Sequence, residues 1–154
     1  MREKAKIMWL ASSGGHMEEL MMLSSTIKKY DSVLFTEKKG NSQNCFRKIY
    51  IVDQVNRRQK FFWLKFLKLF LKSFKLFLIE RPDAVVSTGA LVTVPMAIIA
   101  KVFGKKLIYI ESFARVTEQS LTGKIMYKFA DVFIIQWEEL RKFYPDAMFL
   151  GGIF

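Results

Sequence analysis

The chain has 154 residues, about the length of one domain. Hydrophobic residues make up 51% of it and include 15 Phe, which excludes a disordered chain because disorder requires low hydrophobicity. A single cysteine, Cys45, excludes an internal disulfide and a cysteine-based zinc site, and it indicates a reducing compartment. A single histidine, His16, excludes a multi-histidine metal site. We therefore expect no metal and no cofactor.

The charge is strongly basic and unevenly distributed. Lys and Arg number 25 against 14 Asp and Glu, a net charge of +11. Residues 1–81 carry 17 basic and 7 acidic side chains, whereas residues 82–154 carry 8 and 7. A basic half of this kind favours nucleic acid, an anionic membrane surface or a phosphorylated substrate as the binding partner.

Short apolar runs alternate with helical patterns along the whole chain. The expected elements, in order, are strand 6–11, helix 17–30, strands 32–36 and 48–52, helix 58–80, strand 84–87, helix 94–103, strand 106–110, helix 121–130, strand 132–135, helix 138–143 and strand 148–150. The most loop-like piece is residues 40–44. Continuous apolar strands separated by helices predict an α/β fold: one Rossmann-like domain over residues 1–154, with a parallel sheet covered by helices on both faces.

The start of the chain is basic, and the apolar run that follows, Ile7 to Ala11, is short. A signal peptide needs roughly 7–15 apolar residues and a spanning helix about 20. The longest uncharged stretch, residues 84–100, is interrupted by Gly89 and Pro95. We therefore expect a cytoplasmic protein that touches a membrane from its surface.

Ligands of such sheets bind at the carboxyl ends of the strands, which directs attention to Ser12 to His16. Gly14 and Gly15 allow backbone N–H groups to approach a ligand, and the start of the following helix favours phosphate. The glycine spacing matches neither a dinucleotide fingerprint nor a P-loop. Glu37 stands where a ribose-binding acid would be, so a nicotinamide-dependent oxidoreductase stays open, as does a plain strand–helix turn.

His16 follows the two glycines at this turn. An imidazole there can act as a general base or donate a hydrogen bond to phosphate. The alternative is a helix-start residue with a satisfied ring. Glu19, one turn further on, either caps the helix or orients His16.

Residues 60–79 combine five Lys with thirteen Phe, Leu and Trp. At about 100° per residue, the lysines occupy one arc of roughly 140° and apolar residues fill most of the remainder. This pattern predicts a helix lying in an anionic membrane interface, and segregation of aromatic from basic residues disfavours nucleic acid. A wide core face with a solvated lysine edge is the alternative. The predicted membrane-binding residues are Lys60, Phe62, Trp63, Lys65, Phe66, Lys68, Phe70, Lys72 and Lys75.

Four stretches together resemble one known family. They are Ser13-Gly-Gly-His-Met-Glu-Glu19, Glu111-Ser-Phe-Ala-Arg-Val116, Ser120-Leu-Thr-Gly-Lys124 and Ala130-Asp131 with Gln136-Trp-Glu-Glu-Leu140. In order and spacing they are similar to the membrane-anchor subunit of the eukaryotic N-acetylglucosaminyltransferase that extends dolichol-diphosphate-GlcNAc. Short bacterial enhancer subunits of capsule and exopolysaccharide glycosyltransferases are similar as well.

The resemblance implies the N-terminal half of a GT-B glycosyltransferase, related to MurG-type transferases and active only with a partner subunit that holds a UDP-sugar. This chain would bind a polyprenyl-diphosphate-linked sugar at the cytoplasmic face of the cell membrane. A non-catalytic membrane scaffold is a further alternative. The implied acceptor-binding residues are Ser13, Gly14, Gly15, Glu19, Ser87, Thr88, Gly89, Glu111, Ser112 and Arg115, with His16 as base and Gln136 and Trp137 at the partner interface.

Overall fold

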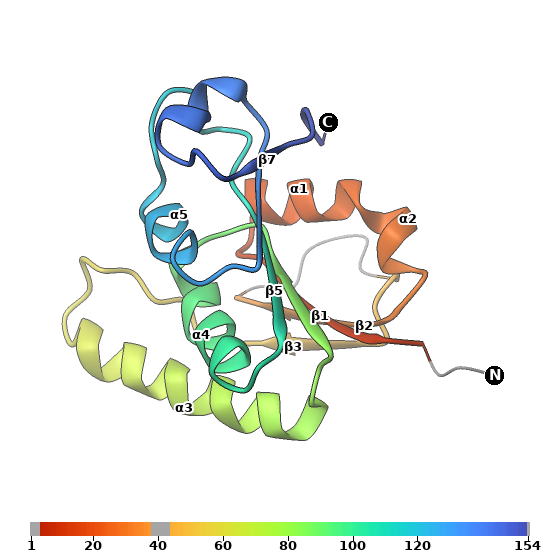
Figure 1. The fold of residues 1–154 in the computed structure, drawn as a ribbon. Helices are drawn as coiled ribbons and strands as arrows, with labels where there is room; N and C mark the ends of the chain where they lie inside the picture. The colour runs from red at the N-terminus through yellow and green to blue at the C-terminus, as the bar shows by residue number, and fades with distance from the viewer. Residues whose placement is uncertain (1–3, 38–43, 154) are drawn as a thin grey trace.

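The computed structural model describes residues 4–37 and 44–153. Within these ranges, seven parallel strands form one sheet in the order β3-β2-β1-β4-β5-β6-β7 (Figure 1). The strands are β1 (Lys6–Leu10), β2 (Asp31–Thr36), β3 (Lys48–Ile51), β4 (Ala84–Ser87), β5 (Lys106–Ile110), β6 (Val132–Ile135) and β7 (Met148–Phe149). The helices are α1 (Gly15–Met22), α2 (Ser24–Ile27), α3 (Phe62–Glu80), α4 (Val94–Val102) and α5 (Leu121–Met126), with 3-10 turns η1 (Leu91–Thr93) and η2 (Glu138–Lys142).

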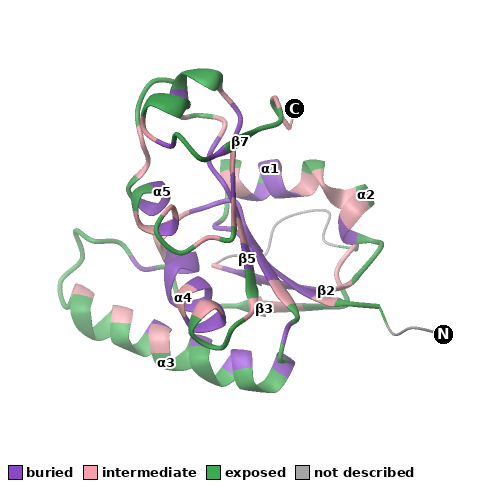
Figure 2. Ribbon diagram, viewed as in Figure 1, coloured by how far each residue is buried: buried purple, intermediate pink, exposed green. Residues whose placement is uncertain are grey.

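Helices cover both faces of the sheet, as predicted. Successive side chains of a strand point to opposite faces, which divides the core into two clusters. Met8 packs on the side of α3, α4 and α5, together with Phe77 and Met96. Trp9 packs on the side of α1 and α2, together with Leu20. Figure 2 shows the strands buried between these layers, which explains their almost continuous apolar sequence.

Several helices are shorter than the sequence patterns predicted. The helix expected at 17–30 is split at Leu23, where ψ is 13°, because Ser24 and the two residues after it have low helix propensity. The helix expected at 121–130 ends at Met126, and the one at 138–143 is a 3-10 turn. Of the loop predicted at 40–44, residues 40–43 lie outside the described ranges.

α3 begins at Phe62 rather than at residue 58. The residue before it, Phe61, has φ 61° and ψ 32°, a left-handed conformation that ends helical geometry. Lys60, which was predicted to lie on this helix, therefore lies in the turn before it. The lysines on α3 itself are Lys65, Lys68, Lys72 and Lys75.

The strand order predicts where along the carboxyl ends of the strands a ligand would bind. β1 pairs with β2 on one side and with β4 on the other. The first three strands are therefore added to the sheet in one direction from β1 and the later strands in the opposite direction, and the order reverses between β1 and β4. Leu10 lies opposite Ser87 in this pairing, and the turns after both residues therefore meet. Open α/β sheets bind ligands at such a switch point.

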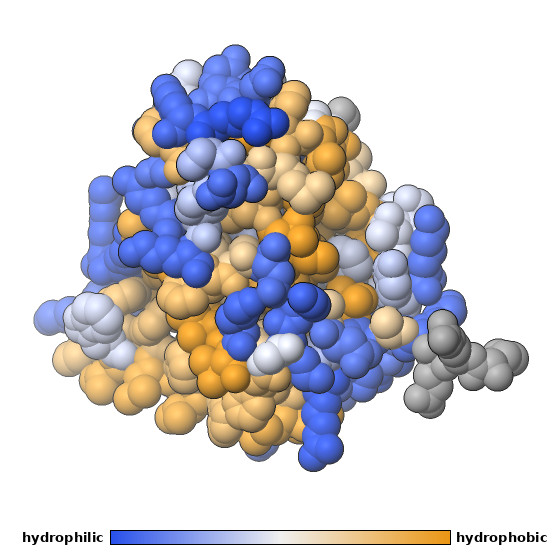
Figure 3. Space-filling model, in the orientation of Figure 1, coloured by the Kyte–Doolittle hydropathy of each residue, from blue (hydrophilic) through white to orange (hydrophobic). Residues whose placement is uncertain are grey.

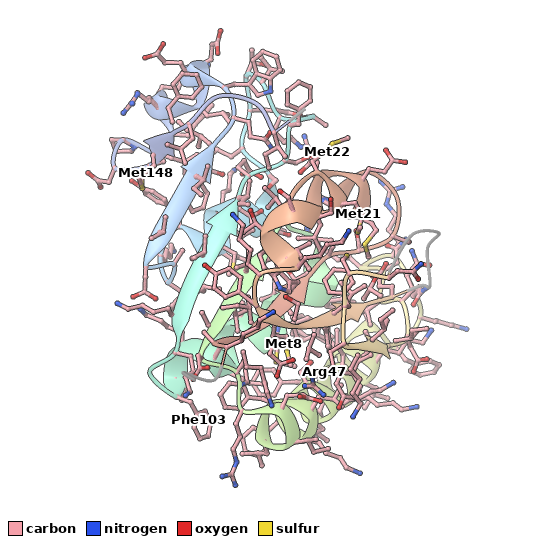
Figure 4. The ribbon with its side chains drawn as sticks, turned by 90° about the vertical axis from the view of Figure 1, so that its right-hand side faces the viewer. Met8, Met21, Met22, Arg47, Phe103 and Met148 are labelled. Atoms are coloured by element: carbon pink, nitrogen blue, oxygen red, sulfur yellow. The ribbon has the colours of Figure 1, made fainter. Side chains whose placement is uncertain are left out.

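A cluster of charged and polar side chains connects the end of α3 to the sheet. The carboxylate of Glu80 accepts hydrogen bonds from Tyr50 Oη at 2.6 Å and from Arg47 Nη2 at 2.9 Å, and Lys6 Nζ lies 3.4 Å away. Arg47 is labelled in Figure 4, on the side of the sheet that α3 covers. Burial raises the pKa of Glu80, but the bonds from Tyr50 and Arg47 and the nearby charges outweigh it and lower the pKa to about 2.

This cluster predicts a pH-dependent stability. A carboxyl whose folded-state pKa is depressed stabilises the fold above its ordinary pKa of 4.5 and loses that contribution as pH falls towards 2. Glu80→Gln should lower the free energy of unfolding by about 2 kcal/mol at pH 7 and by less at pH 3. Urea titrations at several pH values measure this, with Asp53→Asn, an exposed carboxylate, as control. Parallel pH profiles for wild type and Glu80→Gln would contradict it.

Candidate functional site

The Gly-Gly turn between β1 and α1 is open on its outer side. Gly14 precedes α1 with φ 82°, and a Cβ placed on Gly14 or on Gly15 would meet no atom within 4 Å. Ser13 beside them is exposed. Since the partial positive charge of a helix lies at its N-terminus, this turn offers backbone and space to an anionic group.

His16 follows this turn with its ring against Gly89. A Cβ on Gly89 would lie 3.0 Å from His16 Cε1 and 3.2 Å from Tyr109 Oη, and φ of Gly89 is 115°. A side chain at Gly89 would therefore displace the imidazole. Among the described residues, His16 Nδ1 is buried and has no hydrogen-bond partner. Buried polar atoms without a partner are uncommon in folded proteins, and this one lies at the switch point of the sheet.

Ser87 at the end of β4 and Thr88 directly after it support this arrangement from the interior. Thr88 Oγ1 donates to the carbonyl of His16 at 2.8 Å. Ser87 Oγ donates to Thr93 Oγ1 and accepts from the amide of Gly89, both at 3.1 Å. Both side chains are fully buried. Ser87, Thr88 and Gly89 thus form the support on which His16 rests, and their predicted contact with an acceptor stays a prediction.

Glu19 connects α1 to the loop after β5. Its Oε1 accepts from Ser112 Oγ at 3.0 Å and from the Phe113 amide at 2.9 Å. Burial raises the pKa of Glu19, and these hydrogen bonds and the nearby His16 oppose the rise. Oε2 of Glu19 is buried and has no hydrogen-bond partner in the described part of the chain. Glu19 thus connects the start of α1 to the loop after β5, and it does not cap the helix on which it lies.

Glu111, one of the predicted acceptor-binding residues, is fully buried. Its Oε1 accepts from Ser120 Oγ at 2.7 Å and from the Ser112 amide at 3.0 Å, and its Oε2 accepts from Tyr144 Oη at 2.7 Å. Burial, followed by the bond to Glu111, raises the pKa of Tyr144, which keeps this hydroxyl protonated as a donor. Glu111 organises the loop 112–120 from inside.

The turns enclose a cavity of about 380 Å³ at the switch point. Its basic side chains are His16, Arg57 and Arg115. Arg115 is half-buried and pairs with Glu118. Glu37, on which the nicotinamide alternative depended, does not line it. Sequence reasoning missed Arg57; the available signal was its place between β3 and α3, at the carboxyl edge of the sheet.

Gln136 and Trp137 were predicted to lie at the partner interface. Gln136 is only 3% exposed, and its side chain joins the carbonyl of Glu111, at 3.0 Å, to the amide of Ile153, at 2.9 Å. Trp137 Nε1 donates to the Phe113 carbonyl at 2.7 Å, with the two rings 4.8 Å apart. We therefore assign Gln136 to the interior, whereas Trp137 is half-buried and supports the loop after β5.

α3 has three sectors around its axis rather than the two that the sequence indicated. The core-facing sector contains Leu69, Ser73, Leu76, Phe77 and Glu80, with Phe62, Phe66 and Phe70 half-buried beside them. At about 100° per residue, an exposed apolar sector follows over about 100°. It contains Trp63, Leu64, Leu67, Leu71, Phe74 and Leu78. The lysines occupy the remaining sector.

The exposed apolar sector of α3 therefore differs from the residues predicted to bind a membrane. Phe62, Phe66 and Phe70 pack against the core, and of the predicted aromatic residues Trp63, at 77% exposed, faces solvent. Phe103 at the end of α4, which is labelled in Figure 4, extends the apolar surface. Its ring contacts that of Phe74. Figure 3 shows apolar side chains gathered along the edge where Figure 1 places α3. No described helix is both long and apolar enough to cross a membrane.

Comparison with known proteins identifies the family. The model of the family described as "Oligosaccharide biosynthesis protein Alg14 like" matches residues 32–153. The chain belongs to the Alg14 family. It is 30% identical to the human UDP-N-acetylglucosamine transferase subunit ALG14 and 28% identical to the mouse subunit. In both cases the match spans 99% of this chain and 84% of the relative. The resemblance drawn from the sequence motifs is confirmed.

Solved structures show the same fold. MurG of Acinetobacter baumannii matches with a TM-score of 0.72 and 19% identity, over 88% of this chain and 42% of MurG. A UDP-N-acetylglucosamine 2-epimerase of Rickettsia bellii matches with a TM-score of 0.75 and 18% identity, over 98% of this chain and 46% of the epimerase. The chain thus spans less than half of these proteins, and the predicted GT-B half is confirmed as the fold of this Alg14 family member.

Proposed function

We propose that the chain is the acceptor-binding, membrane-associated subunit of a two-component UDP-N-acetylglucosamine transferase. The curated Alg14 relatives carry the name of transferase subunits, and this single observation supports the proposal most directly. The partner subunit holds the UDP-sugar, and transfer takes place where the two chains meet. The product enters a polysaccharide such as a capsule or exopolysaccharide.

The acceptor is a polyprenyl-diphosphate-linked sugar. Its diphosphate binds at the open turn of Gly14 and Gly15, where backbone amides and the α1 dipole favour an anion. Sugar transfer requires a base that removes the proton of the attacking hydroxyl. His16 fills this role, because its imidazole lines the cavity against Gly89 and Thr88 fixes its backbone through the carbonyl.

Reconstitution tests this function. The chain is co-expressed with its partner subunit, and transfer of N-acetylglucosamine from UDP-GlcNAc to a lipid-linked diphosphate acceptor is measured. We expect transfer by the complex and none by either chain alone. Transfer by this chain alone, or an intact complex that uses only water-soluble acceptors, would contradict the proposal.

We place the protein at the cytoplasmic face of the membrane, docked through α3. The exposed apolar sector lies beside Lys65, Lys68, Lys72 and Lys75, which is the division expected of a helix in a lipid interface. Each lysine near an anionic leaflet contributes about 1 kcal/mol. Charge and exposed apolar surface thus act on the same side of the molecule.

Replacing Leu64, Leu67 and Leu71 by Gln should release the protein from anionic vesicles. These side chains are 65%, 56% and 61% exposed, so the protein should remain folded. At about 1 kcal/mol each, the partition coefficient should fall roughly 100-fold. Vesicle sedimentation measures it.

Met22, Met148 and Leu150 are exposed to a similar degree, and Figure 4 labels the two methionines away from α3. Their triple change to Gln is the matched control and should leave vesicle binding within about threefold, since it removes similar apolar area elsewhere. Equal losses in the two triple variants would contradict docking through α3.

A further inference from the structure

Arg57 lies on the loop between β3 and α3 and lines the cavity that contains His16. Its side chain is exposed. Among the described residues it has no hydrogen-bond or ion-pair partner, whereas Arg115, the other arginine of the cavity, pairs with Glu118. Arg57 is therefore a cation held at the cavity without an internal counter-charge.

The surroundings of Arg57 favour an anion. The cavity wall consists of His16, the two arginines, Ser112, Ser120 and Thr122 with four apolar residues, and it includes no carboxylate from the described part of the chain. Glu19 and Glu111 are buried and hydrogen-bonded to Ser112 and Ser120, and Glu118 pairs with Arg115, so none of these carboxylates pairs with Arg57. A guanidinium that has no carboxylate partner, with hydroxyl donors beside it, is the kind of group that recognises phosphate.

The same loop leads from this cavity to α3. Gln54 and Val55 line a second cavity, of about 230 Å³, together with Lys65, Lys68 and Lys72 of α3. Lys72 Nζ donates to the carbonyl of Ile51 at 3.0 Å, which ties the end of β3, where the loop begins, to the helix. The loop that carries Arg57 thus contributes to the wall of the His16 cavity and also contacts α3, the helix that we place on the membrane.

We propose that Arg57 binds the diphosphate of the lipid-linked acceptor and positions it at the Gly14–Gly15 turn. This inference rests on the proposed function, since it assigns a further residue to the same site. A planar guanidinium donates two parallel hydrogen bonds to phosphate oxygens, which fixes both the place and the orientation of the group. A lipid held at α3 then presents its diphosphate to Arg57 and its sugar to His16.

The test uses farnesyl diphosphate, a short polyprenyl diphosphate, with the full-length chain and isothermal titration calorimetry. Arg57→Gln should weaken the Kd by about tenfold or more, because a hydrogen-bonded charge pair is lost. Arg58→Gln, one position away on the same loop and outside the His16 cavity, should change the Kd by less than about threefold. Arg57→Lys should recover part of the loss, and farnesyl monophosphate should discriminate less between wild type and Arg57→Gln.

The outcomes separate this inference from the proposed function. If wild type binds farnesyl diphosphate and Arg57→Gln binds it equally well, the assignment of Arg57 is overturned and the acceptor role stands. Equal weakening by Arg57→Gln and Arg58→Gln also overturns it, because general loop charge then suffices. Absence of binding to wild type overturns the acceptor role together with the assignment. If Arg57→Gln weakens the binding of farnesol as much as that of farnesyl diphosphate, Arg57 acts on the lipid chain and not on the diphosphate, which also overturns the assignment.

Discussion

Replacing His16 by Ala in the two-subunit complex is expected to lower kcat by roughly 10²–10⁴-fold while the KM for the lipid-linked acceptor changes little. The physical reason is the loss of the imidazole that removes the proton of the attacking hydroxyl. The ring lies against Gly89 and lines the cavity, and its Nδ1 is unpaired among the described residues. Steady-state kinetics on the reconstituted complex measures both constants.

Glu18→Ala is the matched control for this variant. Glu18 is an exposed neighbour on α1 and does not line the cavity, so its kinetics should equal those of wild type. A higher KM with a nearly unchanged kcat in His16→Ala would mean that His16 binds phosphate instead of acting as base. Wild-type activity of His16→Ala in an intact complex would remove His16 from the mechanism.

Gly123→Ala is expected to destabilise the protein by about 3–5 kcal/mol, through overpacking and the loss of buried hydrogen bonds. A Cβ on Gly123 would lie 1.9 Å from Glu111 Oε2 and 2.4 Å from Tyr144 Oη. Glu111 is fully buried, so its carboxylate cannot move without breaking its bonds to Tyr144 and Ser120. Urea denaturation followed by circular dichroism measures the loss.

Gly15→Ala is the control for stability, because a Cβ at Gly15 meets open space. Its free energy of unfolding should stay within about 1 kcal/mol of wild type. A Gly123→Ala protein as stable as Gly15→Ala would contradict the account of Glu111 as the internal support of the loop 112–120.

Much of the fold followed from local sequence patterns. Apolar runs separated by helical periods were sufficient to predict a parallel α/β sheet, because only strands buried on both faces are apolar without alternation. The turn of Gly14, Gly15 and His16 was identified as a binding turn for a local reason as well: glycines between a strand and a helix expose the backbone.

Roles that depend on distant segments required the tertiary structure. Glu111 and Gln136 stand in polar motifs, and polar residues are usually exposed, yet their partners Tyr144, Ser120 and Ile153 bury them. Arg57 carried no motif at all. It became a candidate because the order β2-β1-β4 brings the loop after β3 to the same edge as His16.

The sequence by itself determined that α3 carries its lysines in one arc and apolar residues around the rest, since helical periodicity alone places them. Only the tertiary structure decided which apolar residues lie in the core. Phe and Leu are alike to a periodicity analysis, and packing against the sheet and α4 turns Phe66 and Phe70 inward while Leu67 and Leu71 remain exposed. Whether a side chain is buried depends on the surface against which it packs, and that surface is formed by residues distant in the sequence.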